Sequence, residues 1–322
     1  MNNNLSNTTP RLLIVDDLHP VFMEMIEAAG IQFDYRPDIS REESLGILKN
    51  YEGLVLRSKF KVDAEAIDAA SKLQIIARAG AGVDNINEVY AQKKGIYLVS
   101  AAEGNCDAVG EHMLAILLAL INKITIGNEE VKRGLWLREE NRGIELGGKT
   151  VGLIGYGNNG KAMAKKLSGF DVEVLAYDKY KSNYGDANAK ESTMDDIFLK
   201  ADVLSLHIPL TSETRNLVDQ EFLAKFSKSI FFLNGSRGEV VKIEDVIEGL
   251  KNKTILGAGF DVLPIEKFPA LYDTLWYKEL IGFNNVILTP HVAGWSVQSY
   301  FKLSRFLAEK TLMFFKGSNT VK

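Results

Sequence analysis

The middle of the chain holds a strand-length apolar run that ends in a glycine-rich turn, and few folds accommodate this junction. Residues Thr150–Ile154 suit a buried strand, and Gly155, Gly157 and Gly160 follow with the spacing GxGxxG. A stretch that favours a helix, Lys161–Ser168, comes next. In such a unit the first glycine permits a tight turn, the second lets a ligand approach the backbone, and the third lets helix and strand pack closely. The free N–H groups at the start of the helix would face an anion.

A second strand and an acidic residue complete the pattern. Val172–Tyr177 suits a neighbouring strand, and Asp178 closes it 23 residues after Gly155, near the usual spacing of about 20. This order predicts a dinucleotide site, with an ordinary strand–helix turn of an α/β protein as the alternative. A carboxylate at Asp178 favours NAD over NADP because it would repel a 2′-phosphate. The cations Lys179 and Lys181 follow closely and would weaken that preference.

The composition is that of an ordinary globular protein. The 322 residues suggest about two domains, and 46% hydrophobic with 25% charged residues can fill a sizeable core. The formal net charge of −4 implies no broad basic surface, so nucleic acid and anionic membranes are not expected partners. Cys106 is the only cysteine, which excludes an internal disulfide and is consistent with a cytoplasmic location.

Neither the N-terminus nor the longest apolar run predicts a targeting or membrane segment. Met1–Pro10 is polar and asparagine-rich, without the basic and apolar parts of a signal peptide, so we expect a loose tail. The longest apolar run, Met113–Ile121, has nine residues, whereas a membrane-spanning helix needs about 20. We expect this run to be the buried part of a long core helix.

Strands and helices alternate along the whole chain. Before the glycine turn, the pattern predicts strands at Arg11–Val15, Ile31–Tyr35, Gly53–Arg57, Leu73–Ala77 and Ile96–Val99, with helices at Val21–Ala29, Arg41–Asn50, Asp63–Ser71 and Ile86–Lys94. After Asp178 it predicts strands at Ala201–Leu206, Ser229–Leu233, Thr254–Phe260 and Asn285–Leu288, with helices at Asp219–Phe226, Ile243–Leu250 and Ser296–Lys316. Such alternation predicts βαβ units on parallel sheets. The first hundred residues therefore form a domain of their own, followed by a mostly helical segment from Asn105 to Arg133.

Side chains suited to catalysis follow the predicted strands of the second half. His291 follows the last strand, and Arg237 and Glu266 follow two others. Ligands of open parallel sheets bind beyond the carboxyl ends of the strands, so these three side chains would form a workable hydride-transfer site. A surface ion pair between Arg237 and Glu266 is the alternative. Among the other histidines, His207 shares this edge, whereas His112 lies inside the long predicted helix and is expected to serve packing.

A second glycine cluster, Gly80-Ala81-Gly82, follows a predicted strand of the first half. Because Asn85 stands at the third glycine position, we do not expect a second dinucleotide site. Its N–H groups could cradle a small carboxylate, and a turn without a ligand is an equally good interpretation.

Several motifs, in one order, resemble those of the D-isomer-specific 2-hydroxyacid dehydrogenase family, most of all its D-3-phosphoglycerate dehydrogenases. The resemblance runs from about Leu12 to Gly317 and rests on the segments Leu56–Ser58, Gly80–Ile86, Glu145–Gly157, His207–Thr211, Thr214–Val218, Asn234–Gly238, Gly257–Val262 and Thr289–Gly294. It implies an α/β fold of two Rossmann-like βαβ domains with parallel sheets, the C-terminal helix returning to the first. Residues 1–104 with 290–322 would be the substrate-binding (catalytic) domain, and residues 105–289 the NAD-binding domain.

The resemblance implies a role for each candidate catalytic residue. Arg237 would grip the carboxylate and 2-oxygen of a D-2-hydroxy acid. His291 would take the hydroxyl proton as hydride leaves for NAD, and return it in reduction. Glu266 would pair with His291, orient it and raise its pKa above the ordinary value of about 6.5.

Further binding residues are implied by the same motifs. Asn158 and Asn159 would lie on the pyrophosphate, Asp178 on the ribose and Asp261 near the nicotinamide. The expected cofactor-binding residues are Gly155, Gly157, Asn158, Asn159, Gly160, Asp178, His207, Pro209, Gly235, Ser236, Asp261 and Gly294. The expected substrate-binding residues are Arg57, Ser58, Ala79, Gly80, Ala81 and Gly82. No metal site is expected.

Several 2-hydroxy acids are compatible with these motifs. We expect 3-phosphoglycerate, oxidised to 3-phosphohydroxypyruvate in serine biosynthesis, because the cations Arg57 and Lys59 fall beside the implied pocket; the alternative interpretation is solvated loop charges. A glyoxylate or hydroxypyruvate reductase is the alternative enzyme, and an NADH-sensing binding protein without turnover is the alternative class. Members of the family are usually dimers or larger, so a homodimer or homotetramer is expected.

Three features depart from the family pattern. Asn159 stands where an aliphatic residue is usual and would affect cofactor affinity, and Trp295 stands where smaller residues are frequent and would narrow the pocket. The sequence ends at Lys322, so the C-terminal regulatory domain of some phosphoglycerate dehydrogenases is expected to be absent.

Overall fold

The computed structural model describes residues 9–317, so most of the predicted tail Met1–Pro10 lies outside the described residues. The chain divides into two compact units. The first comprises residues 1–105 and 296–322, and the second residues 106–295. We describe each unit by itself.

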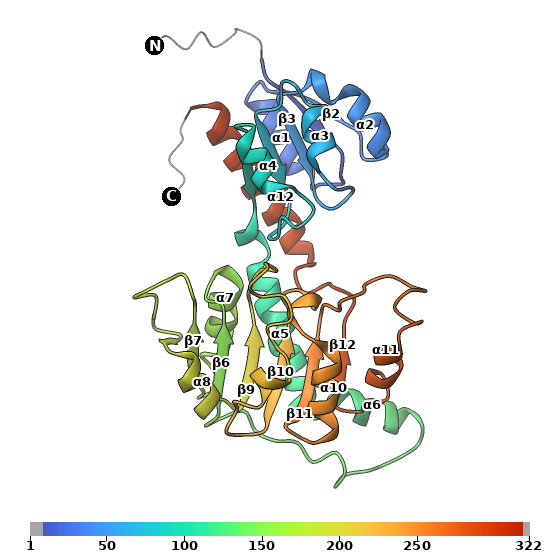
Figure 1. The fold of residues 1–322 in the computed structure, drawn as a ribbon, viewed down its shortest axis with the longest axis vertical. Coiled ribbons are helices and arrows are strands. Elements are labelled where there is room, and N and C mark those ends of the chain that lie inside the picture. Colours follow the sequence, from blue (N-terminus) through green and yellow to red (C-terminus); the bar gives the residue numbers. More distant parts are fainter. Residues whose placement is uncertain (1–8, 318–322) are drawn as a thin grey trace. The chain divides into compact units, whose positions relative to one another are not determined.

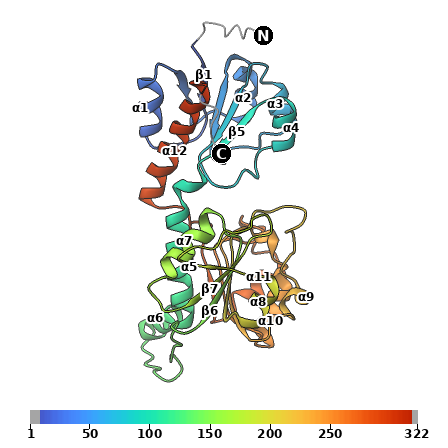
Figure 2. The ribbon, with the colours of Figure 1, turned by 90° about the vertical axis from the view of Figure 1, so that its left-hand side faces the viewer.

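The first unit is a five-stranded parallel sheet with helices on both faces (Figures 1 and 2). Its strands, in the spatial order β2-β1-β3-β4-β5, are β1 (Arg11–Ile14), β2 (Gln32–Tyr35), β3 (Gly53–Leu56), β4 (Ile75–Arg78) and β5 (Tyr97–Ser100). One face is covered by α1 (Val21–Ala28) and α12 (Val297–Phe315), and the other by α2 (Arg41–Ile47), α3 (Ala64–Asp68) and α4 (Glu88–Lys93).

The C-terminal helix α12 belongs to this first unit, which confirms the predicted return of the chain. A capping box at Ser296 starts the helix, and Leu307 and Ala308 are fully buried against the sheet. Polar contacts hold both ends of the buried stripe: the Tyr300 hydroxyl donates to Asp17 Oδ2 at 2.8 Å, and Lys310 Nζ donates to Glu103 Oε2 at 2.8 Å.

The second unit is a seven-stranded parallel sheet in the order β12-β11-β10-β9-β6-β7-β8. Its strands are β6 (Thr150–Ile154), β7 (Glu173–Tyr177), β8 (Lys190–Glu191), β9 (Val203–Leu206), β10 (Ile230–Asn234), β11 (Ile255–Phe260) and β12 (Val286–Leu288). Figure 2 shows α5 (Cys106–Ile121) and α7 (Asn158–Leu167) on one face. It shows α8 (Met194–Lys200), α9 (Gln220–Leu223), α10 (Ile243–Lys251) and α11 (Leu275–Leu280) on the other.

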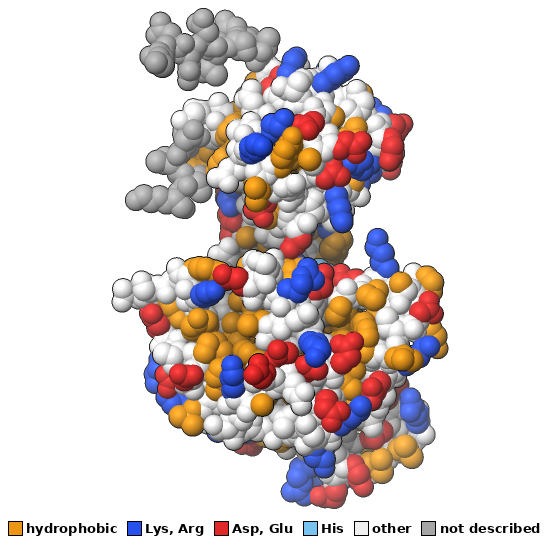
Figure 3. All heavy atoms as spheres, viewed as in Figure 1, with side chains coloured by type: hydrophobic (Ala, Val, Ile, Leu, Met, Phe, Trp, Pro, Cys, Tyr) orange, Lys and Arg blue, Asp and Glu red, His pale blue; other side chains and the backbone are white. Residues whose placement is uncertain are grey.

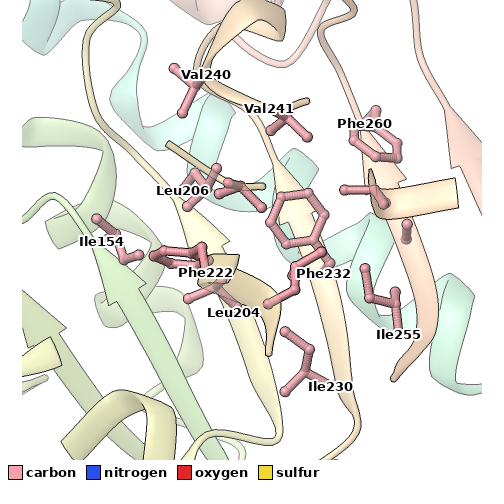
Figure 4. Close-up of a cluster of buried hydrophobic side chains, with 14 of the residues drawn as sticks. Ile154, Leu204, Leu206, Phe222, Ile230, Phe232, Val240, Val241, Ile255 and Phe260 are labelled. Carbon is pink, nitrogen blue, oxygen red and sulfur yellow. The ribbon is translucent and has the colours of Figure 1, made fainter. Parts of the chain in front are cut away.

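The central strands of this sheet are buried on both faces, which explains their continuous apolar sequence. Figure 4 shows one of the two core clusters, in which Phe232 of β10 and Phe260 of β11 lie with Leu204 and Leu206 of β9. The aromatic rings of Phe232 and Phe260 meet edge to face, with centroids 5.8 Å apart. The strands are therefore held rigidly enough to position the residues that follow them.

The predicted helical segment from Asn105 to Arg133 is two helices, α5 and α6 (Ile124–Lys132), whose axes differ by 62°. Lys123 breaks the helix by adopting a left-handed conformation, with φ 53°. Buried Met113, Ile116 and Leu117 confirm α5 as a core helix. Among residues 9–317 no single helix is long and apolar enough to cross a membrane, although the bent α5–α6 pair would pass by length and composition alone.

Several short elements differ from the sequence prediction. The helices α8 and α11 and the two-residue strand β8 were not predicted, and the helices predicted at Asp63–Ser71 and Asp219–Phe226 shorten to α3 and α9. After α3 the chain continues in single turns, as in the Ala70 N–H bond to Ile67 O. A helix of one or two turns contains too few residues for its hydrophobic repeat to define where it begins and ends.

The viewed surface shows no field of a single charge. Figure 3 shows Lys and Arg side chains interspersed with Asp and Glu on both units, with hydrophobic patches among them. This matches the modest net charge of −4.

Candidate active site

The candidate residues of the second unit gather because its strands are parallel. The segments that follow β6, β7, β9, β10, β11 and β12 all leave the same edge of the sheet. β6 is the first strand of the unit, and its neighbours β7 and β9 lie on opposite sides of it. The chain thus reverses direction across the sheet at β6, which is where open α/β sheets bind ligands.

The glycine-rich turn after β6 has the shape that a dinucleotide requires. Gly155 has φ +93°, and a side chain there would overlap the carbonyl of His207. At Gly160 a side chain would overlap the carbonyl oxygen of Gly155, so α7 could not pack this close to the turn. Gly157, by contrast, faces open space. The helix α7 begins at Asn158 without a side-chain cap, so its first N–H groups are available to an anion.

Two enclosed polar atoms beside this turn have no hydrogen-bond partner among the described residues. They are Oδ1 of Asn159 and Nδ1 of His207. The other ring nitrogen of His207 lies 3.0 Å from the Ser205 hydroxyl, and burial lowers the pKa of His207 to about 4, so the ring is neutral at pH 7. Unsatisfied buried polar atoms are costly, and a polar ligand at this turn would relieve that cost. The residues therefore fit a nucleotide diphosphate.

The remaining cofactor candidates lie at the same edge. Asp178 follows β7, and its Oδ2 accepts the Tyr156 N–H at 3.1 Å. Pro209 follows β9, where its carbonyl accepts the Thr214 hydroxyl. Gly235 and Ser236 follow β10; a side chain at Gly235 would meet Met113 of α5, and Ser236 is buried with both its N–H and hydroxyl on Asn234 Oδ1.

The structure brings His291 and Glu266 together. His291 Nδ1 lies 2.9 Å from Glu266 Oε2, and its backbone is left-handed, with φ 56°. The hydrogen bond to Glu266 raises the pKa of His291 above its ordinary value, against the opposing effects of burial and of the positive charge of Arg237. Because Nδ1 is held by the carboxylate, Nε2 is the nitrogen left to exchange a proton. The side chains of His291 and Glu266 are 48% and 43% exposed, so a small molecule can reach them.

Arg237 occupies the third predicted position, immediately after Ser236. It is half-buried, and its Nη1 donates to the Ser236 carbonyl at 2.6 Å. Its charge acts on His291, which places the guanidinium within electrostatic range of the imidazole. The structure thus assembles a cation, an imidazole and a carboxylate from three strand ends.

Asp261 anchors the loop that carries His291. This carboxylate is 2% exposed and accepts the Thr289 hydroxyl at 2.6 Å, the Val292 N–H at 2.9 Å and the Ala293 N–H at 2.8 Å. The backbone N–H of His291 donates to the Asp261 carbonyl at 2.8 Å. These bonds hold the left-handed turn at His291 and tie residues 291–293 to the second unit. Gly294 follows in the same loop, in the turn closed by the Trp295 N–H on the Val292 carbonyl.

His112 corrects one prediction, because it does more than pack. Its Nε2 lies 2.9 Å from Thr289 Oγ1 and 3.5 Å from Asp261 Oδ1. Since Thr289 gives its only hydroxyl hydrogen to Asp261, Thr289 Oγ1 accepts from His112, and His112 carries its proton on Nε2. Sequence reasoning missed this network because its partners lie 177 residues apart.

The predicted substrate-binding residues of the first unit also lie together, because β3 and β4 are neighbours. The backbone N–H groups of Arg57, Ser58 and Lys59 all converge on Asp16 Oδ2 at 2.6 to 3.0 Å, which fixes the loop after β3. Ala79, Gly80, Ala81 and Gly82 follow β4, and the Ala79 N–H donates to the Leu56 carbonyl.

Two basic residues of this loop region differ from expectation. Lys59 turns its ammonium onto the Pro37 carbonyl, so it is engaged elsewhere in the unit. Arg78, which sequence reasoning passed over, lies across the Gly80 turn, where a side chain at Gly80 would overlap its guanidinium. Arg78 Nε donates to the Arg57 carbonyl at 3.1 Å. The available sequence signal was its position directly after the predicted strand Leu73–Ala77, two residues before Gly80. In residues 9–317, no three His, Cys, Asp or Glu side chains are grouped to hold a metal ion.

Known proteins are similar to this chain in both sequence and fold. Residues 114–293 match the family model described as "D-isomer specific 2-hydroxyacid dehydrogenase, NAD binding domain". A D-3-phosphoglycerate dehydrogenase of Archaeoglobus fulgidus is 34% identical over 95% of this chain and 58% of its own length. A glyoxylate reductase of Thermofilum pendens is 34% identical over 86% of this chain and 82% of its own length. A hydroxypyruvate reductase of Thermotoga maritima is 33% identical over 84% of this chain and 87% of its own length.

Solved structures agree with the fold. A protein of Thermus thermophilus superposes with a TM-score of 0.81 and 27% identity, over 95% of this chain and 97% of that one. A D-lactate dehydrogenase of Aquifex aeolicus, solved with NAD and lactic acid, has a TM-score of 0.80 over 95% and 96% of the two chains, and at 24% identity it bears on the fold alone. The chain spans a little over half the length of the D-3-phosphoglycerate dehydrogenases that it matches.

Proposed function

Since the chain belongs to the D-isomer specific 2-hydroxyacid dehydrogenase family, whose NAD-binding domain its second unit contains, we propose that it interconverts a D-2-hydroxy acid and the 2-oxo acid. The observation that carries the proposal is the His291–Glu266 hydrogen bond at the strand edge, under the charge of Arg237. Bound NAD supplies the hydride acceptor, or NADH the donor.

The chain's own residues account for the rest of the chemistry. Arg237 binds the carboxylate of the acid and polarises its 2-oxygen with a fixed fork of donors. In oxidation His291 Nε2 takes the hydroxyl proton, and in reduction it returns the proton to the carbonyl oxygen. Glu266 keeps Nδ1 protonated and stabilises the imidazolium. Asp261 and Thr289 hold the loop so that the imidazole keeps this orientation.

We propose a phosphorylated substrate, 3-phosphoglycerate, oxidised to 3-phosphohydroxypyruvate in serine biosynthesis. Two guanidinium groups support this, since Arg57 and Arg78 follow neighbouring strands of the first unit and suit a second anionic group. The alternative substrates are glyoxylate and hydroxypyruvate. Relatives with a similar sequence identity to this chain are named as reductases of these two acids, and neither acid needs a phosphate site.

Comparing turnover of 3-phosphoglycerate with that of hydroxypyruvate and glyoxylate tests the substrate. The proposal predicts that Arg78→Gln raises KM for the phosphorylated acid by about 10- to 100-fold, the size of a lost charge-assisted contact of about 1.5–3 kcal/mol. Turnover of hydroxypyruvate should change little. Arg41→Gln is the matched control, because Arg41 pairs with Asp63 and Glu65 in the same unit. Activity on hydroxypyruvate with none on 3-phosphoglycerate would favour the reductase.

An NADH-sensing protein without turnover is the alternative from another class. The assembled His291, Glu266 and Arg237 weigh against it, because a sensor needs no proton donor beside its nucleotide. Tight NADH binding by the wild type with no oxidation of NADH by any 2-oxo acid would favour the sensor.

We further propose a homodimer or homotetramer located in the cytoplasm. Large apolar side chains are exposed on α6 and the segment after it, which supports self-association; they are Ile124, Val131, Leu135, Trp136 and Ile144. Trp136 has the largest side chain of these and is 76% exposed, so its burial by a second copy would stabilise the assembly most. Light scattering of the purified chain measures the state.

A further inference from the structure

The carboxylate at the end of β7 is already engaged by the protein. Asp178 Oδ2 accepts the Tyr156 N–H at 3.1 Å and lies 3.2 Å from the Lys181 ammonium, while Oδ1 accepts the Tyr180 N–H at 3.2 Å. A carboxylate has about four lone-pair sites, two on each oxygen. Three are used, so one site on Oδ1 remains. An acid in this position normally accepts from a ribose 2′-hydroxyl, but Asp178 has no free pair of sites for two adjacent hydroxyls.

Two contacts hold the ammonium group of Lys181 in place. Besides Asp178, its Nζ donates to the Tyr156 carbonyl at 2.8 Å, within the glycine-rich turn itself. An ammonium has three N–H donors, so one is left, and the side chain is 44% exposed. A cation with a free donor thus lies beside the carboxylate on which the ribose is expected.

The surrounding charges cancel. Asp178 and Lys181 form one pair, and Lys179 lies 2.6 Å from Glu213 in another. The Tyr180 hydroxyl also donates to Glu213, at 2.7 Å. An acid excludes a 2′-phosphate by repulsion between like charges, and that repulsion is lost when a cation 3.2 Å away neutralises the acid.

We propose that the second unit binds NADP(H) as well as NAD(H), and that Lys181 is the residue that permits it. Its free N–H donates to the 2′-phosphate in NADP(H), and the single open site on Asp178 accepts one ribose hydroxyl in NAD(H). The inference rests on the proposed nucleotide site at the glycine turn, and not on turnover of any acid.

Isothermal titration with NADH and with NADPH, in the absence of substrate, tests the proposal. For the wild type we expect dissociation constants within about tenfold of each other. Lys181→Met should weaken NADPH binding by about tenfold or more, the worth of one charge-assisted contact, and NADH binding by less than about threefold. Lys181→Arg, which keeps the charge, should retain NADPH binding.

Lys190→Met is the matched control, since Lys190 belongs to the same unit and pairs with Glu173 on the surface. It should change neither dissociation constant. Wild-type NADPH binding more than about 100-fold weaker than NADH binding would overturn the proposal, as would equal losses for both nucleotides in Lys181→Met. If neither nucleotide binds, the nucleotide site itself is wrong. Intact binding of both without turnover would instead contradict only the proposed dehydrogenase activity.

Discussion

At the scale of single residues, several independent contacts fix the position of one imidazole, that of His291. His291 has a left-handed backbone, a carboxylate on Nδ1 and a following loop pinned by buried Asp261. Non-glycine residues in that conformation are strained, and such strain persists only where surrounding contacts impose it. The arrangement leaves Nε2 as the one ring nitrogen for chemistry.

Replacing Glu266 with Gln should move the pH dependence of the reaction. The hydrogen bond to Glu266 raises the pKa of His291, so the protonated imidazole that reduction needs persists above pH 6.5 and is lost as pH rises through the raised pKa. Without the negative charge that pKa falls, so the descending limb of kcat/KM for reduction should shift to lower pH. The limb for oxidation, which needs the neutral ring, should shift the same way.

The control for this shift is Glu248→Gln, which removes a surface carboxylate that pairs with Lys251 in the same unit. Its pH profile should match that of the wild type. An unchanged profile in Glu266→Gln would mean that His291 is not the group that titrates in the reaction.

Sequence alone could locate the three candidate catalytic residues but not their support. Arg237, Glu266 and His291 each follow an apolar strand, and parallel strands bring such positions to one edge. The bonds from His112 to Thr289 and from Thr289 to Asp261 join a helix, a loop and a strand end that no local pattern links. Likewise, the engagement of Asp178 by Lys181 is a matter of side-chain direction, which spacing does not show.

At the scale of elements, the contact between β6 and α7 sets the shape of the nucleotide site. Gly160→Ala would push a methyl group into the Gly155 carbonyl, so α7 must move away from the turn. Overpacking of this kind costs about 1–3 kcal/mol, and it should also weaken NADH binding. Thermal unfolding and NADH titration measure both effects.

Gly169→Ala is the matched control, because a side chain at Gly169, just beyond the end of α7, meets nothing within 4 Å. It should leave both the melting temperature and NADH affinity close to the wild-type values. Unchanged NADH binding in Gly160→Ala would contradict the assignment of this turn to the nucleotide.

The loop after β12 depends on the hydroxyl of Thr289, and removing that hydroxyl tests its role. Thr289→Val keeps the shape but removes the hydroxyl that bridges His112 and Asp261. His112 Nε2 then loses its acceptor and Asp261 Oδ1 one of its two donors, at a cost of about 1–3 kcal/mol. Because this loop positions His291, kcat should fall while NADH affinity stays. Thr289→Ser restores the hydroxyl and should recover kcat. Loss of stability without recovery in Thr289→Ser would indicate packing of the methyl group instead.

Element boundaries show where sequence reasoning reaches its limit. Strands of the sheets were predictable because they are buried on both faces and read as apolar runs, as in β10 and β11. The break between α5 and α6 was not predicted, since it depends on a left-handed backbone at Lys123, which a lysine rarely adopts. The short helices α8 and α11 lie outside any clear periodicity.

At the scale of the whole molecule, the chain is two α/β units with different proposed tasks. The second carries the nucleotide turn, the His291–Glu266 pair and Arg237, all on one sheet edge. The first carries Arg57, Arg78 and the Gly80–Gly82 turn at the ends of β3 and β4. The alternation of strands and helices predicts βαβ units on parallel sheets, and the family motifs supply the proposed roles that periodicity cannot.

Hydride transfer is measured through NADH absorbance with a panel of 2-oxo acids, for the wild type and for His291→Ala. We expect the wild type to oxidise NADH with at least one 2-oxo acid. For His291→Ala we expect kcat to fall by about 10²- to 10⁴-fold, the usual contribution of a positioned general acid, with NADH affinity unchanged. Equal rates in wild type and variant, or no turnover of any acid by the wild type despite tight NADH binding, would contradict the proposed role of His291.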